Sequence, residues 1–372
     1  MKLALRELRR RPGRFITATV ILFLIALLLM FLGGLVDGLI DNSTGAVRAQ
    51  QGDVIVFSSD AKDSFLRSKI DADLRATIEA VPGVGKVGGI GVIQLGARIP
   101  GKGPRDLADT ALFGYELAPT GVPETPPALG QAYADETLKS KGVEQGMEIL
   151  VGPYRAPVTI VGFVSDTGYL GQGSLWASPA TWRQVATTNK SVSTLPDGEF
   201  ESLVVRGDGT IGAGDLAAAI DTAGAGATKT LTISEAADAI PGVKEQRSTF
   251  AQIIGVTVAI AIVVVALFFA LLTVERTGLY GVLKAIGAGS GTLFLGVLLQ
   301  AVIVTLIASV AAGALAVVLD LVIPAGSIPF KIGPGRLINS SLQLLLAAAI
   351  GCAFSLRRVL KIDPASAIGG SL

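Results

Sequence analysis

The 372-residue sequence contains few side chains that could carry out covalent or metal chemistry. It has no His, which excludes His-based catalytic triads, His zinc sites and His-ligated haem. Its one cysteine, Cys352, lies in an apolar run and can form no intramolecular disulfide. The G-x-x-x-x-G-K-[ST] phosphate loop is absent, and the Gly-rich stretch 167–174 alone is a weak signal for phosphate binding. We therefore expect no enzyme active site in this chain.

One face of the first apolar run carries polar atoms. Met30, Gly34 and Asp37 are spaced i, i+4 and i+7, so a helix places them on the same side. Gly33 and Gly34 would allow a second helix or a flat ligand to approach closely. Asp37 is either an interfacial carboxylate in water or, if it is buried in lipid, a functional group. Glu245 precedes the second apolar run and is either a partner for this face or a solvated acid favoured by the helix dipole.

Composition indicates an integral membrane protein. Hydrophobic residues make up 50% of the chain and charged residues only 16%, whereas a soluble domain has about 25% charged residues. The net charge of +1 gives no electrostatic basis for binding nucleic acid. The apolar residues form four long runs, which predict transmembrane helices at 15–40, 248–274, 292–319 and 338–356. This predicts an α-helical membrane protein with one helix, a large inserted domain, and then three helices.

Basic residues beside the spans predict the orientation. They gather in three segments that share one side of the membrane, and the positive-inside rule makes that side the cytoplasm. These are an amphipathic N-terminal helix at 1–14, a loop at 275–291 and a tail at 357–372. The domain at 41–247 and the loop at 320–337 are then extracytoplasmic. We expect a multi-pass protein of the cytoplasmic membrane with both termini inside.

The segment 41–247 is predicted to be a mixed α+β domain with its own core. Residues 53–57 and 158–163 have the pattern of strands, and residues 72–80 and 215–223 that of helices. The Gly- and Pro-rich stretch 100–129 is predicted to be loop. Tyr169 and Trp176 are either an apolar, membrane-facing edge of this domain or part of its core.

The loop 275–291 contains a helical apolar face. Leu279, Val282, Leu283 and Ile286 fall at i, i+3, i+4 and i+7. Such a face indicates either a helix that rests on lipid or a helix that docks in a groove of a cytoplasmic partner.

This loop and the one-plus-three arrangement together resemble the MacB/FtsX-type ABC transporter permeases. The likeness rests on Glu275-Arg276 and Gly281-Val-Leu-Lys-Ala-Ile-Gly-Ala288, and the tail Leu360-Lys-Ile-Asp-Pro-Ala-Ser-Ala-Ile368 is similar to the end of the same family. The resemblance implies a homodimer in the lipid membrane with two copies of an ABC-type ATPase, which alone bind ATP and Mg. It also implies that ATP-driven closure is transmitted to the outside domains. The ATPase would dock on Gly278, Leu279, Val282, Leu283 and Ile286.

Within that family, residues 1–8 and 239–246 resemble the haem-export permeases of the HrtB type. The implied cargo is haem, and without His its iron ligand must be Met, Tyr, Cys or a carboxylate. The candidate haem-binding residues are Met30, Phe31, Asp37, Glu245 and Tyr169, with Met30 and Glu245 as iron ligands. Two alternatives remain open: an FtsX-like signal transducer that regulates a cell-wall hydrolase or sensor, and an exporter of lipid, lipoprotein or peptide.

Overall fold

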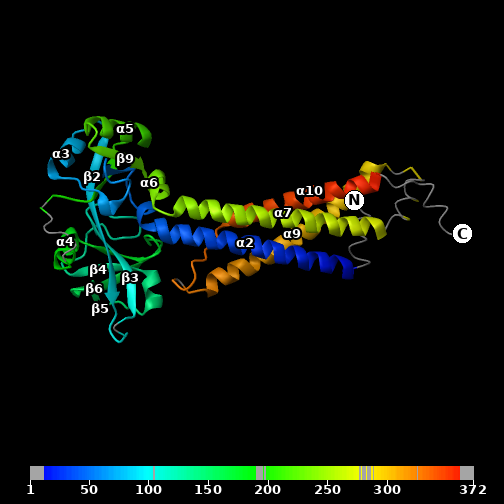
Figure 1. Cartoon of the computed structure of the whole chain (residues 1–372), viewed down its shortest axis with the longest axis horizontal. Coiled ribbons are helices and arrows are strands. Elements are labelled where there is room, and N and C mark those ends of the chain that lie inside the picture. The colour runs from blue at the N-terminus through cyan, green and yellow to red at the C-terminus, as the bar shows by residue number, and fades with distance from the viewer. Residues whose placement is uncertain are drawn as a thin grey trace. The chain divides into compact units, whose positions relative to one another are not determined.

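The chain folds into two compact units (Figure 1). The computed structural model describes residues 12–103, 105–189, 196, 198–275, 278, 282, 286–287, 289–324 and 326–360. One unit, which we call the helical bundle, comprises Met1–Asp37, Arg247–Ile323 and Phe330–Leu372. The other, the sheet domain, comprises Gly38–Gln246 and Pro324–Pro329. The predicted N-terminal helix and tail lie almost entirely outside the described residues.

The helical bundle confirms the four predicted apolar helices. Four described helices are long and apolar enough to cross a membrane: α2 (Pro12–Arg48), α7 (Val243–Glu275), α9 (Ser290–Val322) and α10 (Pro334–Leu360). Each is longer than its apolar run because polar residues at its ends continue the helical hydrogen bonding. The last turns of α2, from Gly38 onward, therefore belong to the sheet domain.

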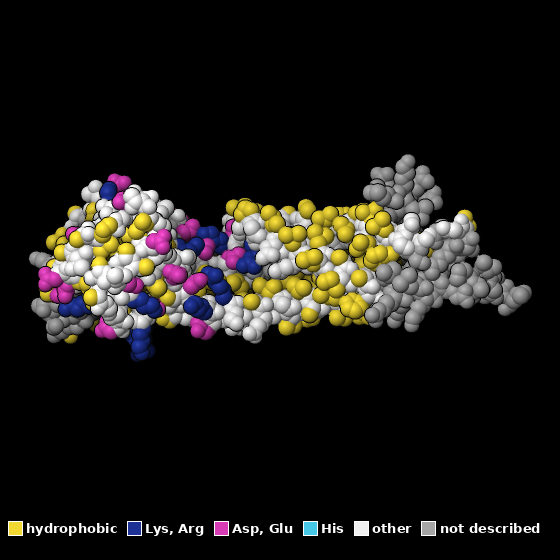
Figure 2. Space-filling model, turned by 90° about the horizontal axis from the view of Figure 1, so that it is seen from above, with side chains coloured by type: hydrophobic (Ala, Val, Ile, Leu, Met, Phe, Trp, Pro, Cys, Tyr) yellow, Lys and Arg dark blue, Asp and Glu magenta, His cyan; other side chains and the backbone are white. Residues whose placement is uncertain are grey.

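Small side chains lie where helices of the bundle approach one another. The buried face of α9 presents Ala301, Ala308, Ala312 and Ala316. On α10, a Cβ at Gly351 would lie 2.9 Å from a backbone carbonyl of α7, so only glycine fits there without a shift. The opposite sides of the helices expose Leu, Ile and Val, and hydrophobic side chains cover the visible face of the bundle in Figure 2. This is the surface expected of helices that face lipid.

The sheet domain, inserted between the first and second membrane helices, confirms the predicted α+β class. Its nine described strands follow the order β3-β7-β4-β6-β5-β2-β8-β1-β9. Because β2 also pairs with β3, the first six strands close into a ring, and the first half of β2 extends the sheet through β8. The strands are β1 (Val54–Ser58), β2 (Val84–Arg98), β3 (Leu107–Tyr115), β4 (Gln131–Asp135), β5 (Glu148–Val151), β6 (Ala156–Val164), β7 (Gly173–Ala177), β8 (Ser202–Gly207) and β9 (Thr228–Thr232).

Short helices cover the sheet: α3 (Ala72–Glu79), α4 (Pro179–Thr188), α5 (Ala213–Ala223) and α6 (Ile233–Ala239), with 3-10 turns η1 (Phe65–Arg67) and η2 (Glu136–Lys141). Trp182 of α4 packs directly over Gly91 and Gly114, where a Cβ would collide with its side chain. The predicted strands and helices at 53–57, 158–163, 72–80 and 215–223 correspond to β1, β6, α3 and α5.

The prediction of loop at 100–129 is wrong for Leu107–Tyr115, which forms β3. This strand pairs with β2 over nine residues and buries Leu112 and Phe113. Gly and Pro gather on both sides of the strand, so the average composition of the stretch hides it.

Candidate functional site

The predicted face of α2 meets the segment that leads into α10. The Phe31 ring stacks on the Phe330 ring with 5.3 Å between their centroids. A Cβ at Gly34 would lie 2.5 Å from the Phe330 ring, and the Lys331 backbone N–H donates to the Gly34 carbonyl at 3.1 Å. The two glycines do permit close approach, as predicted, but the space is occupied by this chain's own side chains.

Asp37 forms an ion pair with Arg336. The Arg336 Nε donates to Oδ2 at 2.7 Å, and a second guanidinium nitrogen donates to Oδ1. The aliphatic part of Arg336 lies against Gly33, where a Cβ would approach its Cδ to 2.5 Å. The side chain of Asp37 is 34% exposed and that of Arg336 19%. Asp37 is thus a paired carboxylate that keeps about a third of its side chain exposed, and its two interpretations stay predictions.

Met30 lies at the floor of an open groove between α2, α9 and α10. Its side chain is only 1% exposed, and its Sδ and Cε lie next to Gly313 of α9, 4.0 and 3.9 Å from the position of a Cβ there. The groove has a volume of about 700 Å³. Its walls are almost entirely aliphatic, and they comprise Met30, Leu306, Ser309, Val310, Gly313, Ala314, Val317, Leu337, Ile338, Ser341, Leu342 and Leu345.

Sequence reasoning missed the residues that complete this region. Arg336 lies at the end of the predicted extracytoplasmic loop 320–337, and Asp37 lies near the outer end of the first predicted span. Their opposite charges on the same side of the membrane are a signal that could have indicated the ion pair. Ser309 gave no signal, because a serine in a membrane helix normally donates to its own backbone. Here its hydroxyl is buried, and the described residues offer it no hydrogen-bond partner.

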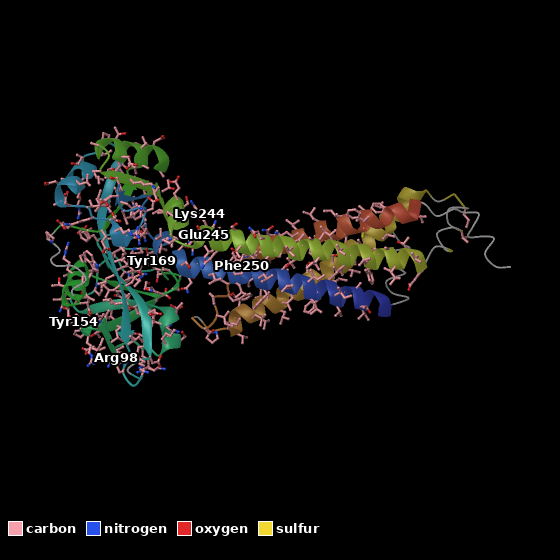
Figure 3. All side chains as sticks on the ribbon, viewed as in Figure 1. Arg98, Tyr154, Tyr169, Lys244, Glu245 and Phe250 are labelled. Atoms are coloured by element: carbon pink, nitrogen blue, oxygen red, sulfur yellow. The ribbon has the colours of Figure 1, made fainter. Side chains whose placement is uncertain are left out.

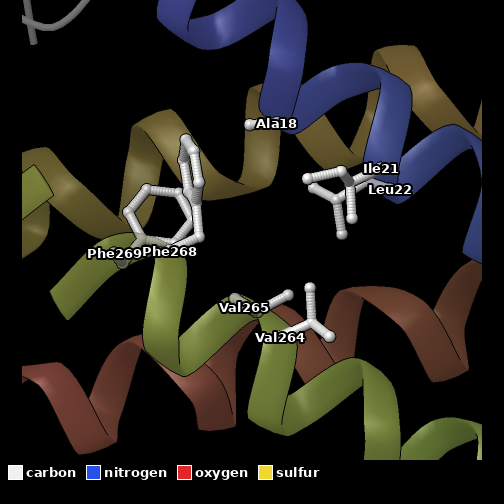
Figure 4. Close-up of a pocket in the computed structure, with 7 residues that line it drawn as sticks. All are labelled: Ala18, Ile21, Leu22, Val264, Val265, Phe268 and Phe269. Atoms are coloured by element: carbon white, nitrogen blue, oxygen red, sulfur yellow. The ribbon is translucent and has the colours of Figure 1, made fainter. Parts of the chain in front are cut away.

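A second, much smaller cavity separates α2 from α7. In Figure 4, Ile21 and Leu22 of α2 face Val264 and Val265 of α7, with Phe268 beside them. The cavity has a volume of only about 10 Å³. At this size it is a packing defect rather than a ligand site.

Two predicted haem-binding residues belong to the sheet domain (Figure 3). Glu245 lies in the first turn of α7 with an exposed side chain, a position that the helix dipole favours for an acid. Tyr169 is 3% exposed, and its ring contacts those of Phe65 and Phe113 edge to face. Burial raises the pKa of Tyr169 above its ordinary range. Trp176 is also fully buried, so the structure places both Tyr169 and Trp176 in the core of the sheet domain rather than at an exposed edge.

The roles of these residues toward haem stay predictions. Met30 and Glu245 belong to different units, so their pairing as iron ligands is not determined. Among the described residues no group of three or more His, Cys, Asp or Glu could hold a metal ion. Any site for iron in this part of the chain would therefore use fewer than three of these side chains, with or without Met or Tyr.

Three of the five predicted docking residues in the loop 275–291 lie among the described residues. Gly278, Val282 and Ile286 are exposed, Val282 by 47% and Ile286 by 79%. The Ile286 N–H donates to the Val282 carbonyl at 3.1 Å, so the two side chains lie one helical turn apart. Leu279 and Leu283 lie outside the described residues.

Residues 252–364, which span α7 to α10, match the family of FtsX-like permease C-terminal domains. Part of the helical bundle is thus similar to the FtsX-like permease C-terminal domain. This confirms the resemblance to MacB/FtsX-type permeases. The docking role of the loop 275–291, which lies inside the matched range, stays a prediction.

Curated relatives of this chain are putative hemin transport system permease proteins named HrtB. The protein of Staphylococcus haemolyticus is 32% identical over 126 residues, covering 34% of this chain and 35% of the relative. That of Staphylococcus epidermidis is 28% identical over 142 residues, covering 38% and 40%. The chain thus matches little more than a third of the length of these relatives.

A solved structure is more distantly similar. The periplasmic region of MacB from Actinobacillus actinomycetemcomitans superposes with a TM-score of 0.35 at 11% identity, covering 52% of this chain and 95% of that one. This likeness is too distant to assign a fold or a function.

Proposed function

We propose that this chain is the permease subunit of an ABC exporter that moves haem, or a similar hydrophobic molecule, out of the membrane. The observation that carries the proposal is the permease match over α7–α10 in a chain with no phosphate-binding loop. A separate cytoplasmic ATPase, in two copies on a homodimer, would supply the energy. The likeness to hemin permeases supports haem as the cargo.

In this proposal the ATPase docks on the loop 275–291. Val282 and Ile286 are large apolar side chains left exposed one turn apart, as expected of a helix that seats in a partner's groove. Replacing Ile286 with Asp should abolish stimulation of the ATPase by the permease, whereas Ile286→Leu should preserve it. The measurement is ATP hydrolysis by the co-purified complex in nanodiscs. Unchanged stimulation of the ATPase by the Ile286→Asp variant would refute docking at this loop.

The cargo site centres on Met30. Its thioether is a soft ligand of the kind that binds haem iron, and Phe31 offers an aromatic face one residue away. Asp37 could take part only if Arg336 releases it, because both carboxylate oxygens accept hydrogen bonds from the guanidinium. Glu245 and Tyr169 remain part of the proposal as residues that cargo meets in the sheet domain.

The test is a haem titration of the purified full-length chain in detergent, followed by the Soret band. Met30→Leu removes the sulfur while nearly conserving volume, and Met147→Leu in the sheet domain is the matched control. We expect saturable binding that Met30→Leu weakens and Met147→Leu leaves unchanged. Absence of saturable binding in the folded wild type would refute haem as cargo and favour lipid, lipoprotein or peptide export, or signalling.

A further inference from the structure

A short strap, residues 330–336, leads into α10 and closes over the face of α2 that carries the two glycines. The ring of Phe330 is 8% exposed and covers one face of the Phe31 ring. Beneath it, no side chain larger than glycine fits at Gly34, because a Cβ there would lie 2.5 Å from the Phe330 ring. The stacking position on Phe31 is therefore filled by the chain's own aromatic ring.

The strap also binds a carboxylate of α2. Both oxygens of Asp37 accept hydrogen bonds from the Arg336 guanidinium, the bond from Nε measuring 2.7 Å. A guanidinium recognises any carboxylate by this two-point geometry, so the carboxylate of a ligand could replace that of Asp37. Phe31 and Asp37 are separated by about 9 Å along the helix. The ring and carboxylate positions thus lie within the reach of one flat molecule.

The two contacts together select what can open the strap. A guanidinium that loses its carboxylate beside apolar side chains keeps unsatisfied donors, and in a membrane protein this state is costly. An apolar ring alone can replace Phe330, but it offers Arg336 no acceptor. A small anion can satisfy Arg336, but it offers no ring to Phe31. The side chain of Asp37 is already 34% exposed, so it can be hydrated when it is released.

Two glycines of the strap are not required by its closed form. A Cβ at Gly333 or Gly335 would meet no atom of the described residues within 4 Å, and neither glycine has a positive φ. Gly33 and Gly34 differ, because a Cβ at either would collide with a side chain of the strap. Glycines that neither crowding nor backbone conformation requires make a segment easier to move. Gly333 and Gly335 are therefore suited to act as a hinge at the start of α10.

We propose that this strap is a lid that opens for a planar molecule carrying a carboxylate. The ring of the molecule replaces Phe330 on α2, and its carboxylate replaces that of Asp37 at the guanidinium. The inference rests on the proposed function, because the molecule that opens the lid would be the cargo. Haem, a flat ring with carboxylate side chains, belongs to this class. The lid adds a requirement that is separate from iron ligation, namely a free carboxylate recognised by Arg336.

The experiment compares protoporphyrin IX with its dimethyl ester, which has the same ring but no free carboxylate. Binding of each fluorescent probe to the full-length chain in lipid nanodiscs is measured above its binding to empty nanodiscs. Neither probe contains iron, so ligation by Met30 does not contribute. The wild type should bind the acid about tenfold or more tightly than the ester, and Arg336→Gln should remove this difference.

Asp37→Asn separates a lid from an ion pair that is merely structural. The amide keeps the shape of the side chain but no longer competes as an anion for Arg336, so protoporphyrin IX should bind about three- to tenfold more tightly. A structural pair predicts unchanged or weaker binding. Asp41→Asn is the matched control, because it removes the carboxylate of another ion pair of α2, with Arg48, and should leave binding unchanged.

Equal affinity of the wild type for the acid and the ester would overturn the proposal, and so would unchanged or weaker binding by Asp37→Asn. If Arg336→Gln fails to fold, these two comparisons still decide it. Saturable haem binding that Met30→Leu weakens, without any preference for the acid, would refute the lid and leave haem as cargo. A preference for the acid in a chain that does not bind haem would refute haem and support the lid.

Discussion

Replacing Glu201 with Gln should stabilise the sheet domain, increasingly so as the pH rises. Glu201 precedes β8, whose pairing with β2 ends at Ile90 and Ser202. Beyond that point the Val92 N–H of β2 donates to the Glu201 carboxylate instead of to a backbone carbonyl of β8. Burial raises the pKa of Glu201 to about 8, and the bond from Val92 only partly opposes the shift. The folded domain thus keeps this side chain protonated at neutral pH.

The sign of the effect follows from proton linkage. Between the ordinary pKa of 4.5 and about 8, the folded state holds a proton that the unfolded state has lost. The free energy of unfolding therefore falls as the pH rises through this window and levels off above it. A shift of this size corresponds to an upper limit of about 5 kcal/mol at 1.36 kcal/mol per pKa unit. Because the side chain is partly exposed, solvent screening reduces our expectation to about 2 kcal/mol.

Gln keeps the shape and the acceptor oxygen but cannot ionise. The variant should unfold with the wild type below pH 4.5 and about 4–8 °C above it at pH 8.5. The chain's two tryptophans, Trp176 and Trp182, are both buried in the sheet domain, so their fluorescence reports the unfolding of this unit. Glu148→Gln, at an exposed glutamate, is the control. Parallel pH profiles of the wild type and Glu201→Gln would refute the reasoning.

Three further substitutions test contacts that the site depends on. Asp37→Ala should lower bundle stability by about 1–3 kcal/mol, and Arg336→Ala added to it should cost little more, as a double-mutant cycle in thermal unfolding by circular dichroism would show. Gly34→Val should displace the Phe330 ring and lower the melting temperature, whereas an unchanged value would contradict the close contact. Asp221→Ala removes the carboxylate that accepts from the Thr230 N–H at the edge of β9, and should destabilise the sheet domain by about 1–3 kcal/mol in tryptophan fluorescence.

The membrane helices could be predicted because their signal is local. An apolar run of about 20 residues is determined by neighbours in sequence, and all four runs are helices in the structure. The strand β3 was missed for the opposite reason. Its nine residues are stabilised by pairing with β2 and β7, and nothing within the Gly- and Pro-rich stretch around it indicates those partners.

The candidate site could be predicted only in part. The spacing of Met30, Gly34 and Asp37 correctly places them along one helix face that receives other segments of the chain. What fills that face comes from residues about 300 positions away in the sequence, Phe330 and Arg336, and helical periodicity contains no information about contacts at that separation. Tyr169 shows the same limit, because its place in a Gly-rich stretch leaves a core position and an exposed edge equally open. The rings that bury it, Phe65 and Phe113, are distant in sequence.

That Gly-rich stretch has a structural explanation rather than a phosphate-binding one. Gly168 accepts a hydrogen bond from the Ala46 N–H near the end of α2 at 2.9 Å, and the Leu170 N–H donates to the Ser43 carbonyl at 3.0 Å. The buried Asp135 carboxylate holds the stretch in place, accepting from both the backbone N–H and the hydroxyl of Thr167. The glycine is required because a Cβ at Gly168 would collide with α2. These hydrogen bonds therefore tie the last turns of α2, which belong to the sheet domain, to β4 and the loop before β7.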